Sequence, residues 1–524
     1  MKRFFLLKSA LVFILAASIT QSCTNLDEEV FNELTTSNVD LTKLTPEQLD
    51  AAIADPYRSL LAMGSHNSFY SLNSVSTDQI LVPHRGADWE DGGQWLRVNR
   101  HEYTPSEPAV ENGWNNLYQG AIKCNFVIDL LESLKGQGAF ADADLEKSQS
   151  EMRGLRAYYY YWLMDLYGNV PLVTAFVVED PAPATQSRQV IYDFITSELS
   201  ASLATLDKPT AAGASSRFNY WTARALQSRV YLNAVSYTGT AQWQNALDAA
   251  NDVINNSPYA LESDYFTNFN VANEGSTENI FTIPYANGSA NGFNWAHMTL
   301  HYSSQSTFDL GAQPWNGYCA LQEFYDSYDD ADLRKGTSGD QTVRGNFHVG
   351  AQFASDGTTR LIDASAEPGD PDGQDLTFTP EINEIAPGAL RQAGARIGKY
   401  EYAIGAQDNL DNDFVMFRLG EMVLNAAEAA YRLGNSGDAL ASVNQIRTRA
   451  GMADFTALTD ADMLAERGRE LFMEGVRRSD LIRFGQYSRT WFGKTAASDA
   501  TKNLMPIPRV QVAANPNLAQ NPGY

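Results

Sequence analysis

The chain of 524 residues carries 63 acidic and 38 basic side chains, which gives a formal net charge of −25 at pH 7. This excess of negative charge disfavours binding to nucleic acid and electrostatic docking on anionic lipid. Cysteine occurs at only three positions, so a fold held together by many disulfides is excluded. Hydrophobic residues make up 44% of the chain, which is enough for a large buried core.

The chain begins with a segment typical of exported proteins. Lys2 and Arg3 precede an apolar run over residues 10–17, which is too short to span a bilayer as a helix of about 20 residues. Small and polar residues follow and end at Cys23, an arrangement that resembles the lipobox of bacterial lipoproteins. We therefore expect a signal peptide over residues 1–22 and lipidation of Cys23. The alternative is an ordinary signal peptide with an incidental cysteine.

Helical periodicity dominates both ends of the remaining chain. A capping signal at residues 45–48 opens the first helix, and Gly168 and Pro171 mark the end of another. Trp114 and Trp162 fall on periodic apolar faces and are predicted to lie in the core. The predicted helical ranges are 49–61, 111–135, 147–167, 187–206, 217–236, 241–256, 415–433, 436–450, 460–474 and 476–485.

Several of these helices are expected to pair, because alanines recur where neighbouring helices would cross. This pattern is typical of tetratricopeptide-like helix pairs, although no strict repeat period is present. We predict a mainly α fold in which such pairs form a scaffold for a large loop-rich insert containing short strands. The expected parts are an N-terminal helical part over 23–256, the insert over 257–414 and a C-terminal helical part over 415–524, together forming one compact unit.

The insert differs in composition from the rest of the chain. It is rich in Gly, Asn, Ser and Asp, and alternating runs at 279–284 and 398–402 predict short strands. A bare loop of about 150 residues is improbable in a compact protein, so the insert should carry its own strands and a functional surface.

Five motifs, in order along the chain, carry a more specific signal. They lie at residues 155–173, 417–429 (FRLGEMVLNAAEA), 443–451 (VNQIRTRAG), 466–485 (ERGRELFMEGVRRSDLIRFG) and 505–524. Together with the lipobox, these motifs resemble the SusD/RagB family of outer-membrane nutrient-binding lipoproteins along nearly the whole mature chain.

A cluster of polar residues lies within one of these motifs. Arg418, Glu421, Asn425 and Glu428 are spaced three to four residues apart, as on one face of a helix. Exposed pairs at this spacing contribute only a few tenths of a kcal/mol, whereas the same groups buried between stacked helices would fix the register. We interpret the cluster as structural rather than catalytic.

Aromatic side chains in loops are the candidate binding residues. Trp89 and Trp95 lie among Gly, Asp and Arg in residues 77–95, without a periodicity that would bury them. In such a setting an aromatic ring presents a flat apolar face to a sugar, while neighbouring polar groups hydrogen bond to its hydroxyls. A second set lies in the insert and consists of Trp295, Trp315 and Tyr318.

The family resemblance implies that a glycan lies across an aromatic platform built from an early loop and the insert. The residues matching that platform are Trp89, Trp95, Trp295, Trp315 and Tyr318. Arg85 and Asp91 are expected to orient the ligand through hydrogen bonds. The alternative for about half of these aromatics is a role in small cores packed under the loops.

No catalytic residue, cofactor or metal ligand is predicted. The chain has no Gly-x-Ser-x-Gly motif, phosphate loop or CxxC pair, and no carboxylate pair for glycoside hydrolysis can be singled out. His297 and His301 are four residues apart but lack the glutamate of a metalloprotease, so we interpret them as ordinary polar positions. A structural calcium ion at the oxygen-rich runs 370–375 or 408–413 stays open.

The resemblance implies a non-catalytic, lipid-anchored glycan-binding protein of the outer membrane. It would act at the cell surface as the lid of a SusC-like TonB-dependent transporter, closing over a captured oligosaccharide. The acidic run Asp27-Glu28-Glu29 resembles the signal that sends lipoproteins of the Bacteroidetes to the cell surface. The alternatives are a peptide-binding RagB-like import lipoprotein and, from another class, a glycoside hydrolase.

Overall fold

The computed structural model describes residues 44–524 except 87, 179, 340–342 and 366–372. The predicted signal peptide, Cys23 and the acidic run at 27–29 therefore lie outside the described residues. Residues 46–524 form one unit. Among its described helices, none combines the length and the apolar character needed to cross a membrane.

The predicted mainly α architecture is confirmed. The α-helices are α2 (Pro46–Arg58), α3 (Phe69–Val75), α4 (Gln94–Arg100), α5 (Pro108–Leu134), α6 (Asp142–Tyr167), α7 (Arg188–Ser202), α8 (Tyr220–Leu232), α9 (Ala234–Thr238), α10 (Trp243–Asn256), α11 (Trp295–Thr299), α12 (Gln322–Tyr325), α13 (Leu419–Arg432), α14 (Ser436–Arg449), α15 (Asp460–Glu470), α16 (Arg477–Arg483) and α17 (Arg509–Ala514). Short 3₁₀ helices are η2 (Ser59–Gly64), η3 (Asp91–Gly93), η4 (Tyr265–Phe269), η5 (Tyr302–Gln305) and η6 (Ala500–Asn503).

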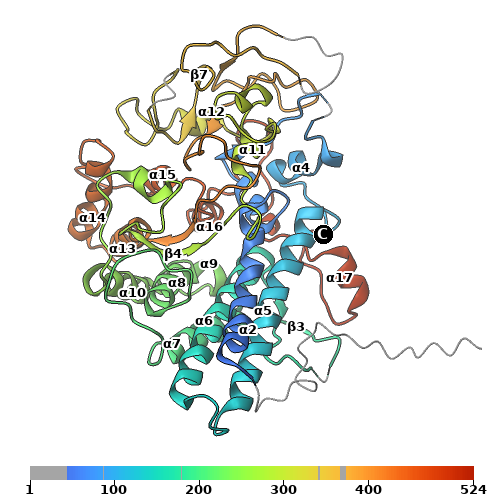
Figure 1. The fold of residues 1–524 in the computed structure, drawn as a ribbon, viewed down its shortest axis with the longest axis vertical. Coiled ribbons are helices and arrows are strands. Elements are labelled where there is room, and N and C mark those ends of the chain that lie inside the picture. The colour runs from blue at the N-terminus through green and yellow to red at the C-terminus, as the bar shows by residue number, and fades with distance from the viewer. Residues whose placement is uncertain (1–43, 87, 179, 340–342, 366–372) are drawn as a thin grey trace, which may run out of the picture. The chain divides into compact units, whose positions relative to one another are not determined.

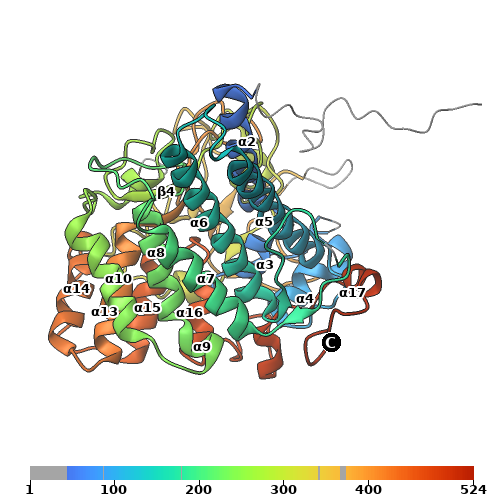
Figure 2. The same ribbon diagram turned by 90° about the horizontal axis from the view of Figure 1, so that it is seen from below.

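The long helices pack side by side as tetratricopeptide-like pairs. Helix α5 lies against α6 and α6 against α7, while α8, α10, α13 and α14 follow one another as neighbours (Figure 2). A Cβ at Gly120 of α5 would fall 2.2 Å from the Tyr159 ring of α6, so only glycine permits this close crossing. Helix α6 ends at Gly168, whose φ of +75° an L side chain rarely adopts.

Short strands pair two by two in the described residues, and all five pairs are antiparallel. They are β1 (Ile80–Leu81) with β5 (Cys319–Ala320), β2 (Val170–Pro171) with β3 (Thr185–Gln186), β4 (Asn279–Ile283) with β10 (Phe414–Arg418), β6 (Phe347–His348) with β9 (Arg396–Ile397) and β7 (Gly350–Ala351) with β8 (Thr377–Phe378). The strand predicted at 279–284 is confirmed by β4. The β1–β5 pair joins the early segment to the insert, and β1 contacts α4. Figure 1 shows α4, α11 and α12 above the long helices α5 and α6.

Two of the predicted elements are wrong. The helix expected over 415–433 starts only at Leu419, because residues 414–418 pair with β4 as a strand buried on both faces. A continuous apolar run of this length has the same appearance in a buried strand and in a buried helix. The strand expected over 398–402 is absent, since β9 ends at Ile397 and Tyr400 instead stacks on Phe414.

The charged cluster at the start of α13 is buried, as the structural interpretation requires. Arg418 is fully buried and forms ion pairs with Glu278 at 2.7 Å, Glu470 at 2.6 Å and Glu474 at 2.7 Å. These carboxylates come from the insert and from the segment around α15, so the pairs tie the insert to the C-terminal helices. Cys124 and Cys319 are also buried, and each is a free thiol.

Candidate functional site

A pocket of about 460 Å³ opens between the early loop and the insert. It is lined by His66, Asp88, Trp89, Asp91, Tyr302, Gln313, Pro314 and Trp315. Trp89 and Trp315 are both partly exposed, and their ring centroids lie 6.4 Å apart with 47° between the planes. The His66 ring lies edge-on to both indoles, and its centroid is 5.9 Å from that of Trp89 and 5.3 Å from that of Trp315. We call the two indoles the tryptophan platform.

A tight turn places Trp89. The backbone N–H groups of Arg85 and Asp88 donate to each other's carbonyl oxygens at 3.2 and 3.3 Å. The indole Nε1 of Trp89 then donates to the carbonyl oxygen of Trp315 at 2.6 Å, which links the two halves of the platform. The ring rests directly over Gly317, because a Cβ there would lie 2.2 Å from Cε2 of Trp89.

Trp315 is held by the backbone around it. Its N–H donates to the carbonyl oxygen of His297 at 2.7 Å, at α11. The buried guanidinium of Arg85 donates to the carbonyl oxygens of Asn316 and Gly317 at 2.7 and 2.8 Å. Arg85 therefore fixes the turn that follows Trp315 rather than reaching into the pocket.

Backbone strain is concentrated at this pocket. Seven non-glycine residues of the described chain have a positive φ, and four of them line the pocket or adjoin a lining residue: Asn67, Trp89, Asp91 and Asn316. Such conformations cost roughly 1–3 kcal/mol each and persist where the surrounding structure imposes them, often at ligand sites. Their clustering supports a functional role for the pocket.

Two carboxylates in the pocket are fixed by aromatic donors. The Tyr302 hydroxyl donates to Oδ2 of Asp88, and Nε1 of Trp95 donates to Oδ2 of Asp91 at 2.8 Å. Within the described residues, the second oxygen of each carboxylate has no hydrogen-bond partner, so it can accept from a ligand hydroxyl. Burial lowers the pKa of His66 despite the opposing charge of Asp91, so its imidazole is neutral at pH 7.

The structure corrects four of the seven predicted ligand contacts. Trp95, Tyr318, Trp295 and Arg85 are only 0%, 1%, 2% and 5% exposed, so none presents a surface to a ligand. Trp295 packs in the core between Tyr70 and Phe414. Tyr318 lies beneath Trp89 at 5.3 Å, and its hydroxyl contacts Ser71.

Trp89, Trp315 and Asp91 are therefore the predicted residues that the structure brings together. The pocket is also lined by residues that were not predicted from the sequence: His66, Asp88, Tyr302 and Gln313. Asp88 directly precedes Trp89 in the loop that was predicted to bind the ligand, so its position in the sequence could have identified it. His66 follows a 3₁₀ helix and Tyr302 lies 13 residues before Trp315, and neither has a local sequence pattern that marks it.

No group of three or more His, Cys, Asp or Glu side chains in the described residues is arranged to hold a metal ion. The rings of His297 and His301 bond to different partners, the carbonyl oxygen of Ala312 and the carboxylate of Asp363. In the run 408–413, Asp411 and Asp413 accept hydrogen bonds from Asn287 and Thr282. Residues 370–372 of the other oxygen-rich run lie outside the described residues.

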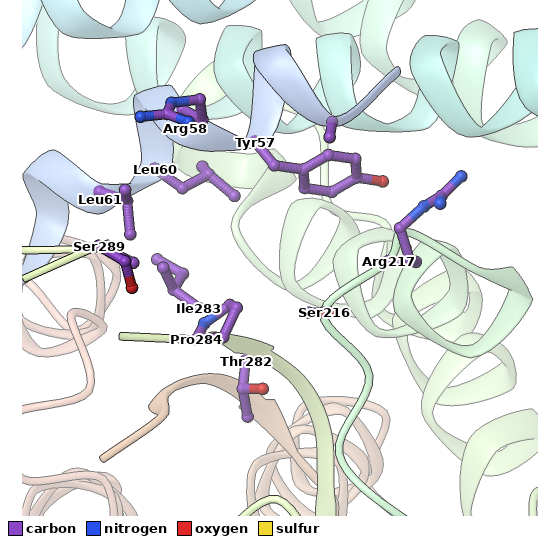
Figure 3. A pocket seen from close by; sticks show the side chains of 12 residues that line it. Tyr57, Arg58, Leu60, Leu61, Ser216, Arg217, Thr282, Ile283, Pro284 and Ser289 are labelled. Carbon is purple, nitrogen blue, oxygen red and sulfur yellow. The ribbon is translucent and has the colours of Figure 1, made fainter. Parts of the chain in front are cut away.

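Two other hollows are less suited to a sugar. A pocket of about 250 Å³ beside α2 and β4 has the buried aliphatic residues Leu60 and Ile283 in its lining, and Tyr57 is the single aromatic ring among its described lining residues (Figure 3). The Tyr57 hydroxyl already donates to Glu151. A hollow of about 580 Å³ beside α5 includes Tyr118 in its lining, but its described lining residues include no carboxylate.

Two family models match the chain. Residues 35–232 match the family described as "Starch-binding associating with outer membrane", and residues 393–524 match the "SusD family". Together these segments make up more than half of the chain. The chain is also similar to "Starch-binding protein SusD" of Bacteroides thetaiotaomicron, with 27% identity over 503 residues that cover 88% of this chain and 86% of the relative.

Solved structures share the fold. The TM-score is 0.72 to "Surface glycan-binding protein A from Bacteroides thetaiotaomicron in complex with laminarihexaose", with 22% identity and coverage of 91% of this chain and 100% of that chain. A SusD superfamily protein from Parabacteroides distasonis also gives 0.72, at 19% identity, with coverage of 92% of this chain and 100% of that chain. At these identities the likeness shows the fold alone.

Proposed function

Because the chain belongs to the SusD/RagB family, we propose that it is a cell-surface lipoprotein that captures an oligosaccharide or polysaccharide between Trp89 and Trp315. The observation that carries the proposal is the tryptophan platform, in which two partly exposed indoles share one pocket with two fixed carboxylates. Relatives whose names describe starch binding and laminarihexaose binding support the same class of ligand.

The pocket meets the two chemical needs of a sugar ligand. The C–H face of a sugar ring stacks on an indole, and burying such a flat apolar surface is favourable. The hydroxyls need directed partners, which the second oxygens of Asp88 and Asp91 and the amide of Gln313 can supply. Because the carboxylates are already held by Tyr302 and Trp95, little conformational entropy is lost when a ligand binds.

The binding test uses calorimetry with soluble starch and laminarin. We expect Trp89→Ala and Trp315→Ala each to weaken binding at least tenfold, which corresponds to about 1.4 kcal/mol. Tyr118→Ala, in the hollow beside α5, is the matched control and should bind as wild type does. Loss of binding in the Tyr118 variant alone would place the glycan site elsewhere.

The alternatives are separated by two further measurements. An assay for reducing ends on the same polysaccharides should give only the background signal. A steady release of new reducing ends would instead show that the protein is a glycoside hydrolase. A peptide panel should give no binding that depends on Trp315. Peptide binding without any glycan binding would instead support RagB-like cargo.

We further propose that the protein is anchored through lipidated Cys23 and acts as the lid of a SusC-like TonB-dependent transporter, as the family resemblance implies. The tagged protein, extracted from outer membranes in mild detergent, should then retain such a transporter in near-equal amount. Recovery of the lipoprotein alone, under conditions that keep other outer-membrane complexes intact, would contradict the lid role.

A further inference from the structure

The tryptophan platform lies in a locally negative surface. Asp88, Glu90 and Asp91 place three carboxylates within four residues, and Glu90 is exposed beside the pocket. The described lining residues include two of these carboxylates but no lysine or arginine. The lining histidine, His66, is neutral at pH 7 because burial lowers its pKa.

Arginines close to the pocket are directed elsewhere. Arg97 of α4 pairs with Glu107 at 2.6 Å and donates to the carbonyl oxygen of Gly92 at 2.7 Å. Arg85 is buried and gives its N–H groups to carbonyl oxygens, including those of Asn316, Gly317 and Ala393. Arg396 lies in the same region and donates to Asn316 Oδ1 and to backbone carbonyls. The guanidiniums of Arg85 and Arg396 therefore stabilise the turn beneath the platform, and none of the three arginines lines the pocket, where an anionic ligand would need a donor.

The carboxylates can only accept hydrogen bonds from a ligand. Sugar hydroxyls can donate to them, whereas a uronate or a sulfate ester brings a second acceptor with negative charge. Two like charges near one another repel, and repulsion at a partly buried site is screened less than repulsion at an open surface. Resting on the proposed glycan-binding function, we propose that this pocket accepts uncharged glycans and excludes glycans that carry uronate or sulfate groups near the bound sugar.

The test compares glycans with one backbone and different charge. Laminarin and the carboxymethyl derivative of the same laminarin are titrated by calorimetry, and soluble starch and carboxymethyl starch form a second pair. At about 10 mM salt, where the Debye length is about 30 Å, we expect the charged member to bind at least tenfold more weakly. At about 1 M salt the Debye length falls to about 3 Å, and the difference should shrink to threefold or less.

Charge variants distinguish the pocket from the net charge of the protein. Glu90→Lys should reduce the ratio between neutral and charged affinities at low salt at least threefold, because Glu90 lies beside the pocket. Glu146→Lys makes the same change of charge at an exposed position on α6 and should leave that ratio unchanged. An equal effect of the two substitutions would assign the selectivity to net charge and overturn the proposal.

The outcomes also separate this inference from the proposed function. Equal binding of the neutral and charged glycans at low salt refutes the charge selectivity and leaves glycan capture standing. A difference that persists unchanged at high salt would point to steric exclusion and would equally refute it. Failure of every uncharged glycan to bind refutes the proposed function itself, and the selectivity with it.

Discussion

Replacing Gly317 with alanine tests whether Trp89 must stay in its present position. The added Cβ would lie 2.2 Å from Cε2 and 2.6 Å from Nε1 of Trp89, whereas ordinary contacts begin at 3.4 Å. The indole would therefore have to move by about 1 Å or more. That movement strains or breaks the 2.6 Å hydrogen bond from Trp89 to the carbonyl oxygen of Trp315 and separates the two halves of the platform.

We expect Gly317→Ala to weaken binding of a neutral glucan at least tenfold in calorimetry, or about 1.4 kcal/mol. The melting temperature should change little, because Trp89 is partly exposed and can swing outward. Gly317 also lacks the positive φ that would strain an alanine. Gly275→Ala is the matched control, since a Cβ there meets nothing within 4 Å.

A double-mutant cycle gives the result that would refute this reasoning. In a Trp89→Ala background the clashing ring is gone, so adding Gly317→Ala should cost no further affinity. If the alanine at 317 weakens binding equally with and without the indole, its effect does not pass through Trp89. Wild-type affinity of the single variant would show that the platform tolerates a displaced ring.

Three further outcomes are expected. Trp295→Ala should lower the free energy of unfolding by about 3–5 kcal/mol in denaturant titrations, because the ring is buried, while Trp315→Ala should cost less than about 1 kcal/mol. Burial raises the pKa of Glu466, but its ion pairs, led by the one with Arg334, have a larger opposite effect and bring this pKa down to about 2. The ionised Glu466 therefore contributes to the free energy of unfolding above about pH 5, and this contribution is lost as the pH falls toward 2. Wild type should therefore lose about 3 kcal/mol more than Glu466→Gln between pH 6 and pH 2, and parallel unfolding curves would contradict this. Cys23→Ala should move the protein out of the detergent phase in phase partition, because acyl chains are the expected anchor.

Much of the fold was predictable because helical periodicity is a local property. The ranges around α5, α6, α10 and α14 differ from the observed helices by a few residues, since their apolar faces recur regularly and their ends carry breakers such as Gly168. The error at residues 414–418 has a different origin. The apolar run over residues 414–417 becomes part of a strand only because β4 lies beside it, and that partner is more than 100 residues away.

The binding residues were harder to predict because exposure depends on distant partners. Trp89 and Trp95 lie six residues apart in the same glycine-rich segment, yet Trp95 is buried at the start of α4 and Trp89 faces the pocket. Tyr318 contacts both rings and comes from the insert. Local composition alone could identify this loop as a candidate surface but could not tell which of its two indoles a ligand would meet.

The same dependence on distant partners explains how the platform is maintained. Trp89 and Asn316 adopt left-handed backbone conformations that cost free energy in isolation. The hydrogen bonds from Arg85 to the turn after Trp315 offset that cost, and Gly317 leaves the space that the Trp89 ring occupies. Neither Arg85 nor Gly317 lines the pocket, yet each fixes one half of the platform. Affinity for a glycan should therefore depend on this buried turn as strongly as on the two indoles that it supports.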